Sequence, residues 1–393
     1  TDHLSHWGSV LLFGAHGLDI YRRPVRQICG STPSGQDHDT VARTLDVQCQ
    51  CWIDDFPRPI AVNWQDHPRP YPLGTLAYFL PQAAAYRWAG WSFRSTNVFA
   101  ILQLVLAAHL AVVLLWLLLR GRVGGALPVV ATILAYAELV HWSLEGFYDA
   151  AGIGCLFWAL LALARRKPAQ SLLAYALATS LHLRALWYAP LAVAALVELW
   201  REGSWRLDRP TGRRSVAAVA AAAIVAATTA LVLWHLRPFL ATFPDNNPLR
   251  QAGAIPASPA FVTAVVASLT LAACATWRRS WLTLACLGSS WFFFLSTTQV
   301  QWWHSLWLLP MPFLELARTR SASDSPLQRA ELIAVGLLWY AAMSRILYQS
   351  YVLEASWLAE LVRRFHRNSV PGPQPPYEEV TYFTYVPPAE EES

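Results

Sequence analysis

Carboxylates, arginines and histidines suited to acid–base or anion chemistry occur in short clusters along this chain. The first cluster opens it, where Asp2 is followed one helical turn later by His6 and Trp7. A carboxylate at the outer mouth of a helix bundle can act as a general base when burial and water access tune it. Asp is also favoured as a solvated helix N-cap, because its side chain accepts hydrogen bonds from free backbone N–H groups. Asp2 is therefore the candidate catalytic residue, with the cap as the alternative.

Two segments of the first 96 residues combine arginine with tyrosine and histidine. Arg22 lies in Asp19-Ile20-Tyr21-Arg22-Arg23-Pro24, and the second segment holds His67, Arg69 and Tyr71 in Asp66-His67-Pro68-Arg69-Pro70-Tyr71-Pro72-Leu73-Gly74. These side chains near a membrane interface suit phosphate recognition, because a guanidinium group presents a planar fork of donors. A surface loop with interfacial arginines would have the same composition.

Charged residues also interrupt the apolar runs farther along the chain. Glu145 and Asp149 are four residues apart and would share a helix face, at a depth where a carboxylate without partners costs about 2–3 kcal/mol. Arg184, with His182 nearby, lies inside an apolar block and needs an anion or a route to the interface. Each of these residues also has a structural alternative. The carboxylates could cap a helix or form ion pairs, and Arg184 could extend its aliphatic stem until its charged group reaches the interface.

A fifth polar cluster lies near residue 300, where Gln301 and His304 flank the pair Trp302 and Trp303. Such a turn could contact a substrate, although paired tryptophans more often form a belt at the membrane interface than a platform for a sugar. Single histidines within apolar runs, His109 and His235, are expected to be structural.

The elements that must position these residues are membrane-spanning helices. Hydrophobic residues make up 55% of the 393-residue chain and charged residues 14%, with a mean hydropathy of +0.31, whereas soluble domains carry about 25% charged residues. The 20 tryptophans fit membrane–water interfaces. The net charge of +5 comes from cations scattered between apolar runs, so no basic stripe is present to bind nucleic acid.

Apolar runs of about 17–25 residues can cross a bilayer as helices. The block 169–200 predicts two short helices that meet at Leu186–Pro190, and 302–317 predicts a short, Trp-rich span. We predict an all-α polytopic bundle of about ten spans, with one more span preceding Thr1. The other predicted spans cover 97–119, 126–142, 146–164, 214–236, 258–277, 281–298 and 329–349.

Basic residues predict the orientation of these spans. They fall at every second connection, which the positive-inside rule places in the cytoplasm: Arg120 and Arg122, Arg165 to Lys167, Arg201 to Arg214, Arg278 and Arg279, and Arg318 to Arg329. The other connections then face outward, and they hold the candidate site residues. The richness in Ala, Arg, Trp and Pro is typical of a GC-rich bacterial genome. Together with this orientation it predicts a bacterial inner membrane, with the site facing the periplasm or the cell exterior.

Three regions follow from this topology: an extracytoplasmic first loop at 1–96, a transmembrane bundle at 97–350 and an extracytoplasmic, partly disordered tail at 351–393. Within the first loop, Leu4, Trp7, Leu11 and Leu12 share one helical face, from which His6 and Ser9 lie away. The stretch Leu73–Trp91, interrupted by Pro81, is a second amphipathic segment. Both are predicted to lie on the membrane surface.

The six cysteines divide between the spans and the first loop. Cys155, Cys274 and Cys286 are expected to be small buried apolar residues of the spans. The outward loop permits oxidation, so we favour one disulfide from Cys29 to either Cys49 or Cys51. A Cys/His metal site is the alternative.

These pieces, in this order, resemble the GT-C superfamily of membrane glycosyltransferases, which take sugars from polyprenyl-phosphate donors. Within it, the chain is most similar to the glycosyltransferase 87-type mannosyltransferases of bacteria, and the likeness extends to about residue 310. It is carried by four elements: Asp2 with His6-Trp7, Gly17-Leu18-Asp19-Ile20-Tyr21, Tyr71-Pro72-Leu73-Gly74 in place of a Tyr-Pro-Pro-Leu element, and Glu145-Gly146-Phe147-Tyr148-Asp149.

The resemblance implies an inverting transfer of a mannose-like hexose or a pentose to a lipid or glycan acceptor. Asp2 would deprotonate the acceptor hydroxyl, and Arg22 or Arg69 with Arg184 would hold the leaving lipid phosphate. The histidines His6, His67 and His304 would assist. No cofactor is implied, a divalent cation stays open, and the partners are the polyprenyl-phosphate sugar, the acceptor and membrane lipids.

A transporter or flippase for a lipid-linked or amphiphilic substrate is the competing hypothesis. It predicts Gly- or Pro-broken helices at matching positions in two halves of the chain. The sequence has one evident broken pair, at 169–200.

Overall fold

The computed structural model describes residues 2–28, 50–51, 60–61, 71–144, 146–201, 210–237, 259–296, 302–317 and 326–349. Nearly all of them are helical, and the strands among them are β1 (Gln50–Cys51) and β2 (Ile60–Ala61), which pair antiparallel. The predicted tail at 351–393 and the predicted disulfide of Cys29 lie outside the described residues. Cys286 is buried, as predicted, whereas Cys155 and Cys274 are only partly buried.

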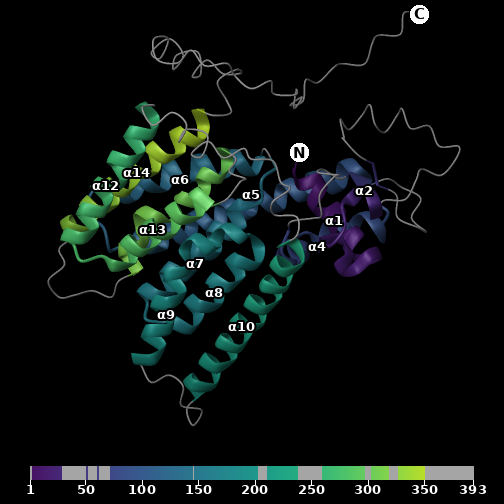
Figure 1. The fold of residues 1–393 in the computed structure, drawn as a ribbon, viewed down its shortest axis with the longest axis horizontal. Coiled ribbons are helices and arrows are strands. Elements are labelled where there is room, and N and C mark those ends of the chain that lie inside the picture. The colour runs from purple at the N-terminus through teal and green to yellow at the C-terminus, as the bar shows by residue number, and fades with distance from the viewer. Residues whose placement is uncertain are drawn as a thin grey trace, which may run out of the picture.

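By chain order the helices divide into three groups, and Figure 1 shows the first of them at one side of the other two. The first group is α1 (Asp2–His16), η1 (Gly17–Tyr21), α2 (Val25–Ile28) and α4 (Leu73–Arg87). The central group is α5 (Phe93–Leu119), α6 (Leu127–Leu144), α7 (Asp149–Ala164), α8 (Pro168–Leu181), η2 (Leu183–Tyr188), α9 (Ala189–Arg201) and the long α10 (Pro210–Leu236). The last group is α12 (Pro259–Trp277), α13 (Trp281–Ser296), η4 (Trp302–Leu308), η5 (Met311–Ala317) and α14 (Pro326–Gln349).

Each of the seven apolar runs predicted to be a single helix forms one, with ends shifted by a few residues. Among the described residues, three helical segments are long and apolar enough to cross a membrane: 94–119, 127–144 and 183–201. Shorter apolar helices cover 149–164, 219–235, 262–277 and 281–294. The fold is therefore helical with candidate membrane-spanning helices, and the total of about ten spans stays a prediction.

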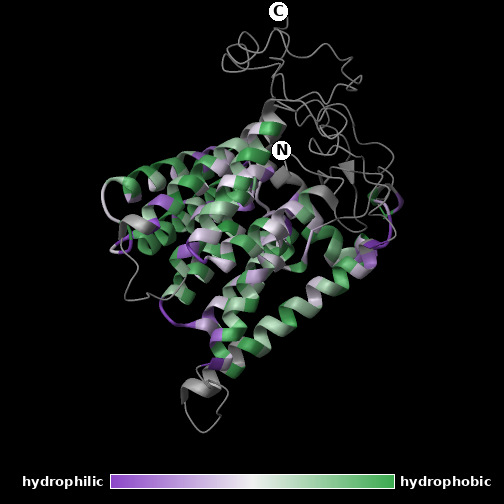
Figure 2. Cartoon of the chain, turned by 60° about the vertical axis from the view of Figure 1, so that its left-hand side comes forward, coloured by the Kyte–Doolittle hydropathy of each residue, from purple (hydrophilic) through white to green (hydrophobic). Residues whose placement is uncertain are grey.

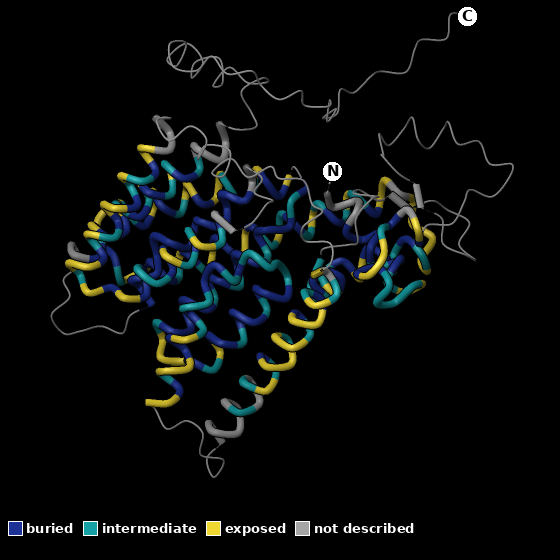
Figure 3. The backbone as a smooth tube through the Cα atoms, in the orientation of Figure 1, coloured by how far each residue is buried: buried dark blue, intermediate teal, exposed yellow. Residues whose placement is uncertain are grey.

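Apolar residues cover the outside of the bundle as well as its interior. Figure 2 shows hydrophobic residues along most of the helices, and Figure 3 shows many exposed positions on the same outer helices. On α5, the side chains of Leu102, Leu106 and Leu110 are 61%, 60% and 55% exposed. Exposed apolar surface on this scale is expected where lipid replaces water around a protein.

The helix break in the apolar block 169–200 lies at His182, four residues before the predicted position. His182 has an extended backbone (φ −153°, ψ 129°), and η2 follows it before α9 begins at Ala189. Pro190 falls in the first turn of α9, where proline is tolerated because its missing N–H would have no partner in the helix.

Residues 302–317 differ from the single short span that we predicted. They form the two 3-10 helices η4 and η5, and residues 304–317 are all buried within the protein. Pro310 and Pro312 explain the interruption, because neither residue can donate the backbone hydrogen bond that continues an α-helix.

The two amphipathic segments of the first loop form helices that pack on each other. In α1, Trp7 and Leu12 of the predicted apolar face are fully buried within the protein, and His6 and Ser9, which were predicted to lie off that face, are buried too. Helix α4 continues through the exposed Pro81 and was wrongly predicted to be interrupted there. Burial on more than one face shows that α1 is enclosed by protein as well as amphipathic.

Helices α4 and α8 are in close contact at Gly74. A Cβ atom added there would lie 2.5 Å from the carbonyl oxygen of Ser180, and backbone atoms cannot move aside cheaply. The glycine in the segment Tyr71–Gly74 thus has a packing role, because it lets the start of α4 reach the helix break at His182.

Candidate functional site

Polar and aromatic side chains from distant parts of the chain meet beside this helix break. We call this group the histidine–arginine cluster. It combines residues from α1, the start of α4, the start of α7, the break before η2, and η4. Its members are His6, Tyr71, Tyr148, Asp149, His182, Arg184, His304 and Trp307.

Asp149 lies at the centre of the contacts and is the first residue of α7. Its carboxylate is 2% exposed, accepts a hydrogen bond from the indole Nε1 of Trp307, and lies 3.7 Å from Nε2 of His182. The positive end of the α7 dipole also favours a carboxylate at this position. These contacts offset the cost of burying the charge, so Asp149 serves as an anchor for the aromatic rings around it.

A turn at Gly146 and Phe147 separates the end of α6 from Asp149. Gly146 has a φ of +92° and ends α6 in a Schellman motif. In this motif, the N–H of Phe147 donates to the carbonyl of Trp142 at 3.0 Å, and that of Gly146 donates to Ser143 at 3.1 Å. Helix α7 begins only at Asp149 and not at residue 146 as predicted, and Glu145, which was predicted to share a helix face with Asp149, lies outside the described residues.

Arg184 and His182 contact each other twice. The backbone N–H of Arg184 donates to Nδ1 of His182 at 3.1 Å, and its Nη1 lies 3.2 Å from Nε2 of the same ring. A neutral imidazole accepts a hydrogen bond at only one nitrogen, and a guanidinium group only donates. One of the two contacts therefore brings two donors together, and the carboxylate of Asp149 lies beside it, 3.7 Å from Nε2 of His182.

Three rings extend the cluster toward α1. The ring centroid of His6, which is 1% exposed, lies 4.3 Å from that of Tyr71 and 4.4 Å from that of Tyr148. The hydroxyl of Tyr21 donates to the carbonyl oxygen of Tyr71 at 2.9 Å and so holds this segment in place. Burial, followed by the charge of Asp149, raises the pKa of Tyr148 well above its usual value. Its phenol is therefore neutral and can donate a hydrogen bond.

The remaining ring contacts join His182 to η4. The ring centroid of His182 lies 5.4 Å from that of Tyr148, 4.9 Å from that of Trp307 and 6.3 Å from that of His304. His304 is 5% exposed. Among the described residues, the cluster thus combines three imidazoles and one guanidinium group with one buried carboxylate, and His182 is the imidazole that lies beside this carboxylate.

Five of the residues predicted from the sequence come together in the cluster: His6, Tyr71, Asp149, Arg184 and His304. Arg22 does not contribute to these contacts. Its exposed side chain lies 3.9 Å from Asp19 and donates to Nδ1 of His235 at 3.3 Å. Of the other predicted site residues, His67, Arg69, Glu145 and Gln301 lie outside the described residues.

Asp2, the predicted catalytic residue, begins α1 and precedes His6 by one helical turn. Residues four apart on a helix share a face, so the backbone of α1 places Asp2 on the side of His6. The structure describes only the backbone at this position.

Sequence reasoning misses Tyr148 and Trp307 as members of the site. Tyr148 precedes Asp149 in the chain and could have been noticed for that reason. Trp307 is one of 20 tryptophans, and nothing in its type or spacing distinguishes a buried partner of Asp149 from a residue of the interface belt.

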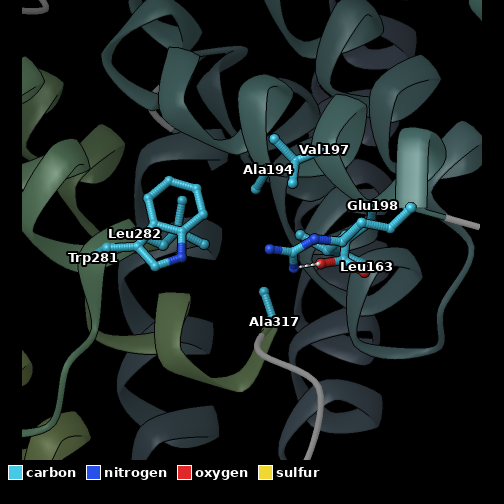
Figure 4. A pocket seen from close by; sticks show the side chains of 8 residues that line it. Leu163, Ala194, Val197, Glu198, Trp281, Leu282 and Ala317 are labelled. Atoms are coloured by element: carbon cyan, nitrogen blue, oxygen red, sulfur yellow. Dashed lines mark hydrogen bonds and ion pairs between the residues drawn. The ribbon is translucent and has the colours of Figure 1, made fainter.

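Within the described residues, no group of three or more His, Cys, Asp or Glu side chains is arranged to hold a metal ion. A pocket of about 330 Å³ lies at the far end of α7 from the cluster (Figure 4). It is lined mainly by apolar residues of α7, α9, α13 and η5, and none of the predicted site residues lines it. In this pocket, Nη1 of Arg201 lies 3.0 Å from Oε1 of Glu198.

Comparison with known proteins gives no match to a protein-family model, to a curated protein or to a solved structure. The resemblance to the GT-C superfamily therefore rests on the sequence elements quoted above.

Packing at Gly152 gives a first testable expectation for the cluster. A Cβ atom added to Gly152 would collide with Cη2 of Trp307, which is fully buried. Alanine normally stabilises a helix by about 1 kcal/mol relative to glycine. We nevertheless expect Gly152→Ala to lower the free energy of unfolding by about 1–3 kcal/mol, because the core is overpacked. Thermal unfolding in detergent measures the change.

Gly288→Ala is the matched control, because Gly288 lies in α13 with nothing within 4 Å of an added Cβ. This substitution should leave the protein as stable or make it slightly more stable. Equal melting temperatures for the two variants would contradict the close packing of Trp307 on α7.

Proposed function

We propose that this chain is an inverting glycosyltransferase of the GT-C type. It would take a mannose-like hexose or a pentose from a polyprenyl-phosphate donor and pass it to a lipid or glycan acceptor outside the cytoplasm. The supporting observation is the meeting of His6, Tyr71, Asp149, Arg184 and His304, which are scattered over 300 residues of sequence, in one cluster. The proposal includes a bundle of about ten spans in a bacterial inner membrane.

The position of the cluster along α7 supports a site on the outer side. Asp149 starts this 16-residue helix, and Arg165, Arg166 and Lys167 follow its end. At 1.5 Å per residue the helix is about 24 Å long, which is most of the thickness of a bilayer core of about 30 Å. Because the basic end is expected to face the cytoplasm, the cluster belongs near the outer surface, where lipid-linked sugars are available.

Arg184 is the group that we assign to the donor phosphate. Its guanidinium lies against His182 in a partly buried setting, where a charge is less screened than in water. When the bond between the anomeric carbon and the phosphate oxygen breaks, its electron pair leaves with the polyprenyl phosphate. Preorganised donors stabilise that developing charge, and enzymes usually gain more rate from such stabilisation than from any other single effect. His182 and His304 would add donors to the same oxygen atoms.

Asp2 is the group that we assign to the acceptor. Its carboxylate would take the proton from the acceptor hydroxyl while the hydroxyl oxygen bonds to the anomeric carbon from the face opposite the phosphate. Asp149 is less suited to this step, because its carboxylate already accepts from Trp307 and lies beside His182. We assign Asp149 to positioning these rings.

A transporter or flippase is the second candidate, and the break between α8 and α9 is the observation that favours it. Broken helices with a charged residue at the break form the substrate sites of many transporters. Arg184 lies in η2, directly after the break, so the same arginine could hold the phosphate of a lipid that crosses the membrane intact.

Purified full-length protein in liposomes distinguishes the two functions. The liposomes would contain synthetic polyprenyl-phosphate sugars with radiolabelled sugar, together with acceptor from membrane extracts. We expect the label to move from the donor to the acceptor. Movement of a fluorescent polyprenyl-phosphate sugar across the bilayer, with its sugar still attached and no product formed, would favour the transporter.

A further inference from the structure

The last carbonyl of α8 has a hydrogen-bond donor from outside its own helix. Helix α8 ends at Leu181, and the carbonyl groups in the last turn of a helix need partners that the helix does not supply. If α8 continued, the N–H of Ala185 would donate to the carbonyl of Leu181. This N–H donates instead to the carbonyl of His182 at 3.1 Å. The break therefore leaves the carbonyl of Leu181 available to another element.

Thr75 of α4 supplies the donor. Its side chain is fully buried, and its hydroxyl donates to the carbonyl oxygen of Leu181. The preceding residue, Gly74, lets α4 come close enough for this contact, because it has no Cβ atom to collide with the backbone of Ser180. Little water can reach a carbonyl at such a contact, so losing the hydroxyl would leave it poorly satisfied.

His182 holds the other side of the break. Its Nδ1 accepts the backbone N–H of Arg184 at 3.1 Å and so caps η2. The hydroxyl of Thr75 thus fixes the carbonyl of Leu181, and the imidazole fixes the N–H of Arg184 three residues later. The backbone between these two hydrogen bonds determines where the side chain of Arg184 begins.

Helix α4 is anchored to α5 by a separate set of hydrogen bonds. The side chain of Gln82 donates to Oε1 of Gln103, whose Nε2 donates to the carbonyl of Tyr78 at 2.7 Å. The hydroxyl of Tyr78 donates back to the carbonyl of Gln103 at 3.2 Å. Helix α1, which begins at Asp2, packs against α4. The pair of helices that carries Asp2 is therefore fixed to the bundle and contacts the break through Thr75.

We propose that Thr75 is a positioning residue for Arg184. Its hydroxyl holds the helix break in place and so couples the helices that carry Asp2 to the arginine assigned to the donor phosphate. The phenol of Tyr148 also interacts with this hydroxyl, which links the start of α7 to the same point. The effect on sugar transfer rests on the proposed function, whereas the effect on the backbone of the break does not.

Thr75→Val removes the hydroxyl and keeps the branched shape of the side chain, and Thr75→Ser keeps the hydroxyl. We expect Thr75→Val to lower kcat by about 10–10²-fold with a smaller change in KM, because a displaced Arg184 stabilises the developing charge less. Thr75→Ser should keep most of the activity. Adding Thr75→Val to Arg184→Gln should cause no further loss, because Thr75 acts through that arginine. Initial rates of transfer by the full-length protein in liposomes measure these effects.

Thr179→Val is the matched control. Thr179 is also buried and lies in the last turn of α8, but its hydroxyl donates to the carbonyl of Ala176 within the same helix at 2.8 Å. The substitution removes a buried hydroxyl next to the break without removing the contact to α4. We expect its kcat and KM to equal those of the wild type.

Hydrogen–deuterium exchange of the backbone at 182–186 separates this inference from the proposed function. Exchange should be faster in Thr75→Val and should match the wild type in Thr75→Ser and Thr179→Val. If the wild type transferred no sugar but exchange changed in this way, the proposed function would fail and the role of Thr75 at the break would stand. Wild-type exchange or wild-type kcat in Thr75→Val, or a further loss in the double variant, would overturn the role of Thr75.

Discussion

Arg184→Gln is expected to lower kcat/KM for a polyprenyl-phosphate sugar by about 10²–10³-fold, which is typical for the loss of one group that stabilises developing charge. Glutamine keeps much of the side chain's length but removes the positive charge beside His182. Arg184→Lys should recover part of the activity, because lysine retains the charge and loses the planar fork of donors. Initial rates of sugar transfer over a range of donor concentrations measure these effects.

Arg201→Gln is the control for this experiment. Arg201 ends α9, the helix that follows η2, and it pairs with Glu198 rather than with the cluster. We expect its kcat/KM to stay within about twofold of the wild type, because surface ion pairs contribute little. If Arg184→Gln kept the wild-type kinetics and melting temperature, the assignment of the donor phosphate to Arg184 would be contradicted.

Asp2→Asn is expected to lower transfer by about 10²–10⁴-fold, the usual contribution of a general base. Asparagine preserves the hydrogen-bonding shape of an N-cap and can still begin α1, so the variant separates the catalytic role from the capping role. In the wild type, the rate should rise with pH through the pKa of the carboxyl group, because only the ionised form accepts the proton. The variant should lose that rise.

Asp19→Asn supplies the comparison for Asp2. Asp19 lies in η1, in the same N-terminal segment, and contacts Arg22 at the surface at 3.9 Å. Its substitution should change neither the rate nor the pH profile. If Asp2→Asn transferred sugar as fast as the wild type, Asp2 would not be the general base. Its role would then be that of a helix N-cap, which its position at the start of α1 also permits.

The helices were the most predictable part of the molecule, because long apolar runs with basic residues at their ends mark where they lie. These runs correspond to α5, α6, α7, α10, α12, α13 and α14. Breaks were harder to place. The break lies at His182, where the imidazole accepts a hydrogen bond from the backbone N–H of Arg184. This is four residues before the predicted junction at Leu186–Pro190 and eight residues before Pro190 itself. Proline proved to be compatible with helix at Pro81 and Pro190.

Most members of the polar cluster were predictable from the sequence, but Tyr148, Trp307 and the geometry of the cluster were not. Asp149, Arg184 and His304 stand out as charged or titratable residues in apolar surroundings, where each needs a partner. The partners depend on tertiary contacts between residues far apart in sequence, such as the hydrogen bond from Trp307 to Asp149. The surroundings of His6 also depend on tertiary contacts. The helical periodicity places His6 off the apolar face of α1, but its ring packs against Phe79 of α4 and against Tyr148.

Product analysis in the liposome assay tests the central claim most directly. The donor would carry one defined anomeric configuration, and both polyprenyl phosphate and glycosylated acceptor would be quantified. An inverting transferase releases one polyprenyl phosphate for each sugar transferred and gives a product of the opposite configuration, which is the result that we predict. A product that retains the donor's configuration, or donor that crosses the membrane uncleaved while no product forms, would contradict the account.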